Sequence, residues 1–257
     1  MGTATATLSL CQWLSSSSSM RMHVRFSCRT PHLTASAVDR TLYSAEVAME
    51  AAKAAIAGGI SVLEIVVLTP GVFEQLVKEH PTMALGICFH LLSFYLVSHM
   101  VGTVLRIEDA KSAINAGAKF LMSPATVKDI MVMDYVQSGE ILYIPGTMTP
   151  TEILSTWDEG AKIVKVGLCI FFNVYCVEEL GGFQYISALK KAFPHVSMVA
   201  SQGIKIDSIG EYILRGASAV VLSDAIFDKD AIAQHDFDKI QNLAHSAALL
   251  GNKSVNR

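Results

Sequence analysis

Short apolar runs recur along the chain from residue 60 onward, and several of them follow a glycine that ends an alanine-rich or polar segment. The glycine lies within Ala116-Gly-Ala, Glu159-Gly-Ala and Arg215-Gly-Ala, each directly before an apolar run. Runs that are apolar at nearly every position are typical of parallel strands buried on both faces. Seven runs are predicted as strands: Ile60–Val67, Thr82–Gly86, Lys119–Met122, Ile141–Pro145, Lys162–Val166, Val196–Ala200 and Ala219–Leu222.

Segments rich in helix-forming residues separate these runs. Ser44–Ala57 is the clearest, because strong helix formers fill it and Gly58-Gly59 stops it. Alternating helices and buried strands indicate an α/β fold with a parallel sheet. Seven strands at this spacing predict a (β/α)8 barrel that lacks its first strand, with an open doubly wound sheet as the alternative.

Two charged residues interrupt the apolar runs. Lys165 lies between two valines, and Glu64 lies within Val62–Val67. Burial disfavours a charged ammonium, so a lysine held away from water tends toward the neutral amine, which attacks carbonyl carbon to form a Schiff base. The alternative for Lys165 is a lysine at a strand end whose ammonium group reaches water. The alternative for Glu64 is a structural ion pair, for which Lys165 is one candidate partner.

Composition excludes several classes of protein. The chain has 257 residues, of which 51% are hydrophobic and 17% are charged, so it can bury one large core. The net charge is −3 and no run of basic residues follows a phosphate backbone, so we expect no nucleic-acid partner. No CxxC and no His/Asp/Glu cluster occurs at ligand spacing, so no metal site is predicted.

The first 38 residues differ from the rest. They contain no Asp or Glu, eight Ser, five Thr, and arginines at positions 21, 25 and 29. This composition is typical of an organellar transit peptide, and the excess of hydroxyl residues favours the plastid stroma. We therefore predict a disordered leader at 1–38 and one barrel domain at 39–257; a merely disordered tail is the alternative.

Two apolar segments do not fit the repeat, and we interpret them as insertions near 87–101 and 167–174. Met83–Leu105 has no formally charged residue and is long enough to span a bilayer. It would break a regular β/α series and lacks basic flanks, so we expect no membrane span.

Several motifs together resemble the 2-keto-3-deoxy-6-phosphogluconate (KDPG) and 4-hydroxy-2-oxoglutarate (KHG) aldolase family, in its plant form. The resemblance covers the chain from about Ala45 to the C-terminus, and agreement of several motifs in order is more specific than any single match. The motifs are Gly58-Gly-Ile-Ser-Val-Leu-Glu64, Gly102-Thr-Val-Leu105, Ala116-Gly-Ala-Lys-Phe-Leu-Met-Ser-Pro124, Met148-Thr-Pro-Thr-Glu-Ile-Leu154, Glu159-Gly-Ala-Lys-Ile-Val-Lys165 and Leu180-Gly-Gly182.

The resemblance implies a homotrimeric β/α barrel that cleaves 2-keto-4-hydroxy acids to pyruvate and an aldehyde, without metal or organic cofactor. It implies that Lys165 is the Schiff-base lysine and Glu64 the general acid and base. Substrate contacts are implied for Thr103, Pro124, Ser201, Gly203 and Ser223, the last three from loops that hold a substrate phosphate in bacterial relatives.

The chain also departs from the family pattern. Leu68 stands where bacterial members have an arginine, Gln202 replaces a glycine of the phosphate loop, and Asp224 adds a negative charge beside it. Two other functions therefore stay open: an inactive barrel homologue that acts as a binding or assembly protein, and an imine-dependent decarboxylase of a 3-keto acid.

Overall fold

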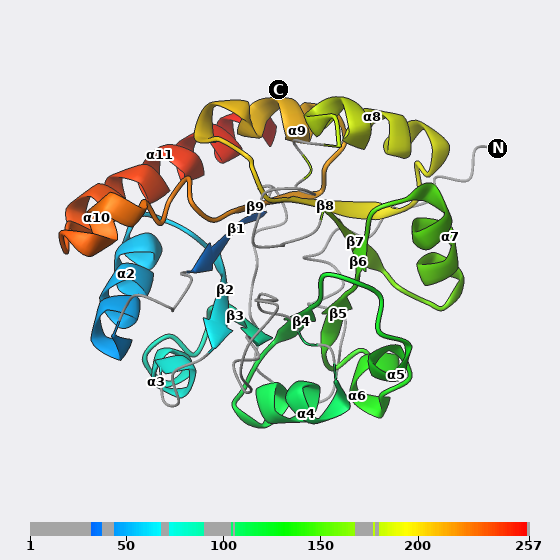
Figure 1. The fold of residues 1–257 in the computed structure, drawn as a ribbon, viewed down its shortest axis with the longest axis horizontal. Coiled ribbons are helices and arrows are strands. Elements are labelled where there is room, and N and C mark those ends of the chain that lie inside the picture. The colour runs from blue at the N-terminus through cyan, green and yellow to red at the C-terminus, as the bar shows by residue number, and fades with distance from the viewer. Residues whose placement is uncertain are drawn as a thin grey trace, which may run out of the picture.

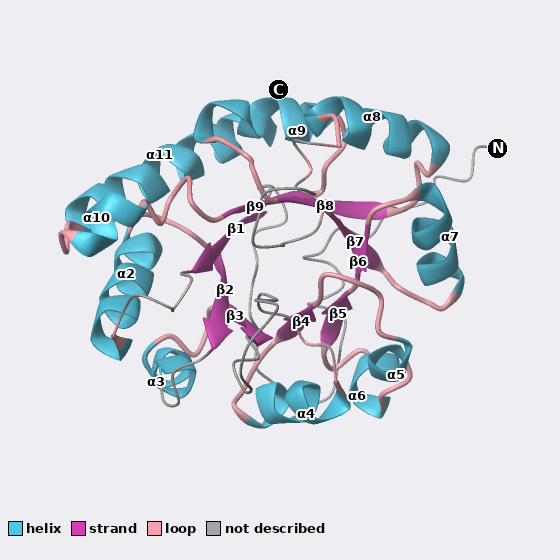
Figure 2. Ribbon diagram, viewed as in Figure 1, coloured by secondary structure: helices cyan, strands magenta, loops and turns pink. Residues whose placement is uncertain are grey.

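A computed structural model of the chain describes residues 32–37, 44–67, 72–89, 104, 106–167, 177 and 180–255. Parallel strands form a ring, and helices surround it on the outside (Figures 1 and 2). The strands are β1 (His32–Ala37), β2 (Val62–Val67), β3 (Ala84–Phe89), β4 (Phe120–Met122), β5 (Leu142–Ile144), β6 (Gly146–Thr147), β7 (Ile163–Val166), β8 (Ser197–Ser201) and β9 (Ala219–Leu222). The helices are α2 (Ala45–Ala57), α3 (Val72–Glu79), α4 (Ile107–Asn115), α5 (Lys128–Met131), α6 (Asp134–Gln137), α7 (Pro150–Asp158), α8 (Gly182–Ala192), α9 (Ile209–Leu214), α10 (Lys229–Ala233) and α11 (Phe237–Val255), with a 3₁₀ turn at Ile206–Ser208.

The ring closes through a strand that a proline divides in two. The sheet order is β5-β4-β3-β2-β1-β9-β8-β7-β6, and each pair of neighbouring strands is parallel. Its two ends, β5 and β6, are consecutive in the chain with only Pro145 between them. The Ile144 carbonyl accepts from the Ser123 amide at 3.2 Å, and the Pro145 carbonyl accepts from the Lys165 amide at 2.8 Å. The segment 142–147 therefore bonds to β4 through its first half and to β7 through its second half. Counted as one strand, it gives the ring the eight strands of a (β/α)8 barrel.

Alternating side chains of each strand divide the core into an inside and an outside. Along β7, Ile163 belongs to the apolar cluster within the ring, and Val164 belongs to the cluster between the ring and the helices. Both clusters are buried, which explains why the strands are apolar at nearly every position. The inner cluster consists of Val62, Ala84, Phe120, Met122, Leu142, Ile144, Ile163, Val199, Ala219 and Val221.

The start and end of α2 agree with the sequence prediction. The Ser44 side chain accepts from the Val47 amide at 3.4 Å, which caps the first turn. Gly58 ends the helix, and a Cβ added there would overlap Ala244 of α11. A larger residue at position 58 would therefore separate two helices that pack against each other.

The prediction that the first strand is lacking was wrong. His32–Ala37 forms β1, which pairs in parallel with β2 on one side and β9 on the other. This strand lies inside the range 1–38 that we had assigned to a leader; residues 1–31 lie outside the described residues. The segment His-Leu-Thr-Ala-Ser-Ala is too small and polar to be recognised as a strand from its sequence, and backbone pairing on both sides defines it as one.

The two predicted insertions fall mostly outside the described residues. Ile87–Phe89, at the start of the first, instead extend β3, which pairs with β2 up to Phe89. Gly167, at the start of the second, directly follows β7. Within the described ranges, no helix combines the length and apolar character that crossing a bilayer requires.

Candidate active site

Lys165 is buried inside the barrel. It is the third residue of β7, two positions after the inward-facing Ile163, and its residue is only 4% exposed. Residues two positions apart on a strand point to the same face of the sheet, so Lys165 also faces the inside of the barrel. A lysine whose head reached solvent would be more exposed, so the burial predicted from the flanking valines is confirmed.

Glu64 occupies the equivalent position in β2. It follows the inward-facing Val62 by two residues and is 2% exposed. Its Oε1 atom is buried and accepts no hydrogen bond. A buried carboxylate oxygen without a donor is costly unless a ligand or water supplies one. The structure thus leaves an acceptor open inside the ring.

The two residues come from opposite sides of the barrel. Counting either way around the sheet order, with β5 and β6 as one strand, β7 lies four strands from β2 (Figure 1). The interior of an eight-stranded barrel is only as wide as the side chains that fill it. Lys165 and Glu64 therefore project into the same interior from facing strands.

A glycine lies beside each of them. Gly146 of β6 is the register partner of Lys165, and Gly86 of β3 is the register partner of Glu64. Neighbouring positions in a parallel pair face the same way, and glycine contributes no side chain there. Gly86 therefore adds no side chain next to Glu64, whereas the Pro124 carbonyl group occupies the position that a Cβ on Gly146 would take.

The two charged residues are not joined in an ion pair. Among the described residues, ion pairs occur on the outer surface, for example between Lys53 and Glu79 at 3.2 Å and between Lys128 and Glu159 at 2.7 Å, and none includes Lys165 or Glu64. The alternative of a structural ion pair between them is therefore contradicted.

The polar residues form a layer at the carboxyl end of the barrel. Lys165, Glu64 and Ser201 each follow an apolar inward residue by two positions. Ser201 of β8 is fully buried, and its Oγ has no hydrogen-bond partner. The carboxyl end is where active sites of β/α barrels lie. The apolar residues two positions earlier, Val62, Ile163 and Val199, fill the barrel interior below this polar layer.

The loops after β8 and β9 are joined by side chains. Gln202 and Gly203 both have left-handed backbones, with φ of 74° and 75°. The Ser223 hydroxyl donates to Oε1 of Gln202 at 3.4 Å, and Asp224 beside it is exposed. The structure thus brings together Ser201, Gly203 and Ser223, which sequence analysis had placed in one loop pair; their substrate contacts stay predictions.

The loop after β6 is held by a capping box at the start of α7. The Glu152 carboxylate accepts from the Met148 and Thr149 amides at 2.7 and 2.8 Å, and the Thr149 hydroxyl accepts from the Glu152 amide. Partial burial raises the pKa of Glu152, but these hydrogen bonds outweigh it and leave the pKa below its ordinary value. The backbone that follows Gly146 is therefore fixed.

Pro124 and Thr103 complete the predicted set. Pro124 is half-buried after β4, and its carbonyl group lies where a Cβ on Gly146 would be. Pro124 therefore lies next to the register partner of Lys165, whereas Thr103 lies outside the described residues. Sequence analysis missed Gly146 and Tyr143; Tyr143 is a tyrosine inside an apolar run, whose hydroxyl needs a partner when buried.

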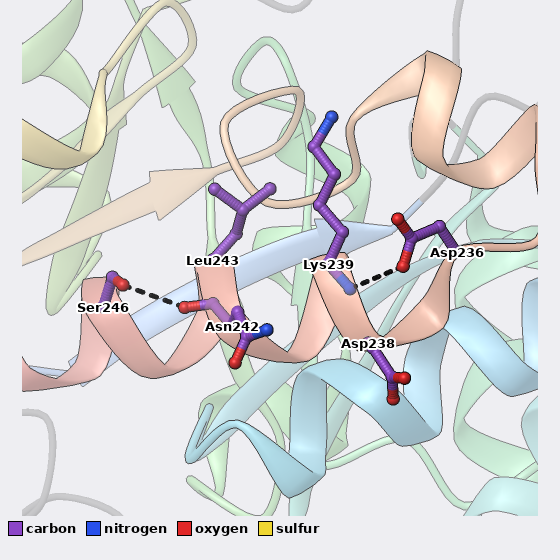
Figure 3. Close-up of a pocket in the computed structure, with 6 residues that line it drawn as sticks. All are labelled: Asp236, Asp238, Lys239, Asn242, Leu243 and Ser246. Atoms are coloured by element: carbon purple, nitrogen blue, oxygen red, sulfur yellow. Dashed lines mark hydrogen bonds between the residues drawn. The ribbon is translucent and has the colours of Figure 1, made fainter.

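The described part of the chain offers no second centre of this kind. No group of three or more His, Cys, Asp or Glu residues is arranged to hold a metal ion there. A surface pocket of about 310 Å³ lies along α11, where its residues bond to one another: Asp236 accepts from the Lys239 amide at 2.9 Å, and Ser246 donates to the Asn242 carbonyl at 2.9 Å (Figure 3).

Comparisons with known proteins agree with this geometry. The family model for KDPG and KHG aldolase matches residues 38–243. The chain is 26% identical over 205 residues to the KHG/KDPG aldolase of Escherichia coli K12, covering 79% of this chain and 85% of that protein. It is 28% identical over 207 residues to the 2-dehydro-3-deoxy-phosphogluconate aldolase of Treponema pallidum, covering 79% and 87%.

A solved structure gives the same result. The KDPG aldolase of Legionella pneumophila, with pyruvate captured as a covalent carbinolamine intermediate, superposes with a TM-score of 0.67 at 25% identity, covering 86% of this chain and 95% of that one. Because the family model matches well over half of the chain, the protein belongs to the KDPG and KHG aldolase family.

Proposed function

We propose that this protein is a Schiff-base lyase that cleaves a 2-keto-4-hydroxy acid, of the 2-keto-3-deoxy-6-phosphogluconate or 4-hydroxy-2-oxoglutarate type, to pyruvate and an aldehyde. Membership of the family supports a class I aldolase-like lyase. The observation that carries the proposal is a buried lysine facing a buried glutamate whose Oε1 has no partner, in a layer above an apolar floor.

Lys165 begins the reaction. Its neutral amine attacks the C2 carbonyl of the keto acid, and the resulting carbinolamine loses water to give a protonated imine. The low exposure of Lys165 supports this step, because its amine lies inside the barrel, where a keto acid bound in the ring can reach it. The positively charged imine then withdraws electrons from the bond that will break.

Glu64 moves the protons. Its carboxylate accepts the proton of the C4 hydroxyl, directly or through water, as the C3–C4 bond breaks and the aldehyde leaves. The bonding electrons pass to the imine and form an enamine, which takes a proton at C3. Water then hydrolyses the imine, releasing pyruvate and regenerating Lys165. The open Oε1 of Glu64 supports this role, because a substrate hydroxyl would satisfy it.

The loops after β8 and β9 favour a substrate end without phosphate. Gln202 fills part of the space between them by bonding to Ser223, and exposed Asp224 adds a negative charge. A phosphate placed there would meet like charge. We expect kcat/KM to be higher for the unphosphorylated 4-hydroxy-2-keto acid than for its phosphorylated counterpart.

Location and assembly are part of the proposal. We infer that the acid-free residues 1–31 act as an organellar leader for the plastid stroma, because their composition is that of a transit peptide. We also infer a homotrimer from the family resemblance; Val132 and Leu154, which are 69% and 49% exposed, are apolar side chains that a subunit contact would cover. Import into isolated plastids and light scattering test the two inferences.

Borohydride trapping with labelled pyruvate tests the chemistry. We expect reduction to attach the label covalently to the wild-type protein. In Lys165→Ala we expect no adduct, and pyruvate release from the keto acid falls by at least about 10³-fold. Lys162→Ala is the matched control, because Lys162 is an exposed lysine three positions earlier in the chain and should keep both activities.

Absence of an adduct on the wild type, or an adduct that survives in Lys165→Ala, contradicts the proposed function. Two further assays separate the other functions. A chain that folds but neither forms the adduct nor releases pyruvate is a binding or assembly protein. Oxaloacetate decarboxylation faster than aldol cleavage identifies the decarboxylase.

A further inference from the structure

The Tyr143 side chain lies between the ring of strands and the helices, yet its hydroxyl is hydrogen-bonded to the loop that follows β4, next to the candidate site. It occupies the middle of β5, between the inward-facing Leu142 and Ile144, and is 3% exposed. Its ring packs in the cluster between the strands and the helices. A tyrosine hydroxyl buried this far from water needs hydrogen-bond partners, and the partners it uses decide what it does.

All of those partners belong to the β4 loop, which we define as Ser123–Val127. The Val127 amide donates to the Tyr143 hydroxyl at 3.0 Å. The Ser123 Oγ lies 2.6 Å from the same hydroxyl and donates to the Ala125 carbonyl at 2.6 Å. The Tyr143 hydroxyl also donates to the Ala125 carbonyl at 3.4 Å. Tyr143 therefore closes the β4 loop into a ring of hydrogen bonds.

A second pair of hydroxyls anchors the other side of the β4 loop. Thr126 Oγ1 lies 2.7 Å from Thr156 Oγ1 of α7 and 3.3 Å from the Gly146 carbonyl, to which it donates. Thr156 is 1% exposed. The loop is thus attached to β5, β6 and α7 at once, and movement is restricted from both ends.

The β4 loop meets the site at Gly146. Gly146 faces inward, two residues after Ile144, and a Cβ on it would overlap the Pro124 carbonyl group. The Pro124 carbonyl therefore lies on the inner side of β6, against the register partner of Lys165. A shift of the loop changes the space beside the amine.

We propose that Tyr143 is a positioning residue that holds the β4 loop, and with it Pro124, at the distance from Lys165 that a bound keto acid requires. The inference rests on the proposed function and names a residue outside the substrate's reach. Its chemical basis is that the Tyr143 hydroxyl is hydrogen-bonded at both ends of the loop: it accepts a hydrogen bond from the Val127 amide, and it shares one with the Ser123 hydroxyl.

The protonation state of Tyr143 agrees with this role. Burial raises its pKa above the ordinary value of 10.0, and its hydrogen bonds with Ser123 and the Val127 amide only partly oppose that effect. The hydroxyl therefore keeps its proton, and its bond to Ser123, throughout the neutral range.

Tyr143→Phe tests the proposal, because it removes the hydroxyl and keeps the ring that packs in the core. The rate of borohydride trapping is measured against pyruvate concentration. We expect the concentration for half-maximal trapping, and KM for the keto acid, to rise about 3- to 10-fold. We expect the maximal trapping rate and kcat to stay within about twofold, because Lys165 and Glu64 are untouched.

Three further variants separate positioning from simple stability. Tyr135→Phe removes the hydroxyl of an exposed tyrosine in α6 and should leave KM unchanged. Ser123→Ala breaks the same ring of hydrogen bonds at its other end and should raise KM similarly. The double variant of Ser123 and Tyr143 should then add little to either single change, since one network is lost in all three.

Amide hydrogen exchange gives a readout that does not depend on activity. In Tyr143→Phe we expect the Val127 amide to exchange faster, while amides of β7 and β8 exchange as in the wild type. Unchanged exchange at Val127 overturns the proposal.

The proposal and the proposed function fail in different ways. If the wild type forms no pyruvate adduct, the proposed function is wrong. If the wild type forms the adduct but Tyr143→Phe has the same pyruvate dependence, Tyr143 has no positioning role, whether or not the melting temperature falls.

Discussion

Two groups of buried polar side chains differ in how their hydrogen bonds are used. At the β4 loop, the Ser123 hydroxyl and the Tyr143 hydroxyl from β5 are hydrogen-bonded to each other and to the backbone of the loop. Neither residue has a buried side-chain oxygen without a partner. At the barrel mouth, Glu64 and Ser201 each have a buried oxygen without a partner. Both groups are equally shielded from solvent, with exposure of 3% or less.

The difference shows what each group is for. Satisfied buried networks fix a single conformation, because breaking any bond leaves the others uncompensated. Unsatisfied buried groups cost stability and persist where a ligand completes them. The β4 loop is therefore a rigid wall, and we expect the substrate to bind at the mouth, where Lys165 and Glu64 face each other from opposite strands.

The largest effect is expected for Glu64→Gln. Replacing the carboxylate removes the base and keeps the shape, so kcat should fall about 10²- to 10⁴-fold. The melting temperature should hold or rise, because the buried Oε1 atom has no hydrogen-bond partner among the described residues and its replacement breaks no bond. Steady-state kinetics and thermal unfolding measure the two quantities.

Glu140→Gln, at an exposed turn, is the control and should change neither quantity. A marked loss of stability in Glu64→Gln would mean that the carboxylate has a structural partner, and would remove the contrast with the β4 loop.

A smaller effect, on the free energy of unfolding, is expected when each of two buried serines is replaced by alanine. Ser123→Ala removes the buried hydrogen bonds of Ser123 to the Tyr143 hydroxyl and the Ala125 carbonyl, and should lower the free energy of unfolding by about 1–3 kcal/mol. Ser201→Ala deletes an oxygen that bonds to nothing in the described residues, so the free energy of unfolding should change by less than about 0.5 kcal/mol while KM rises. Urea unfolding of both variants makes the comparison; equal losses would contradict it.

The smallest effect is a pH dependence of stability. The pKa of Tyr143 is raised by burial above 10.0, so above that pH the unfolded chain releases this proton before the folded one does. The stabilisation is fully present below pH 10 and is lost as pH rises through the folded pKa. The free energy of unfolding should therefore fall more steeply between about pH 9 and about pH 11 in the wild type than in Tyr143→Phe. Parallel slopes would show that Tyr143 is not buried in the native protein.

Much of the fold could be predicted from apolar runs alone. All seven predicted strands occur in the structure, as do the end of α2 at Gly58 and the burial of Lys165 and Glu64. Each depends on local composition, since a strand buried on both faces must be apolar along its length. The predicted strand Ile141–Pro145 corresponds to β5, and Pro145, which lacks an amide proton for the ladder, separates β5 from β6.

β1 and the β4 loop could not be predicted in this way. His32–Ala37 has no apolar pattern, and Tyr143 and Ser123 are separated by 20 positions in the chain. A register between strands and a hydrogen bond between distant residues appear only when the chain closes on itself.

The sequence by itself determined seven of the strand segments but not β1, which two charged residues are buried among apolar neighbours, and which family the motifs resemble. The tertiary structure decided that Lys165 and Glu64 face each other from opposite strands beside two glycines, that their ion pair is absent, and that Tyr143 holds a wall of the site. The physical reason is that burial is set by the composition of each segment, whereas proximity and hydrogen-bond satisfaction are set by how segments far apart in the chain pack together.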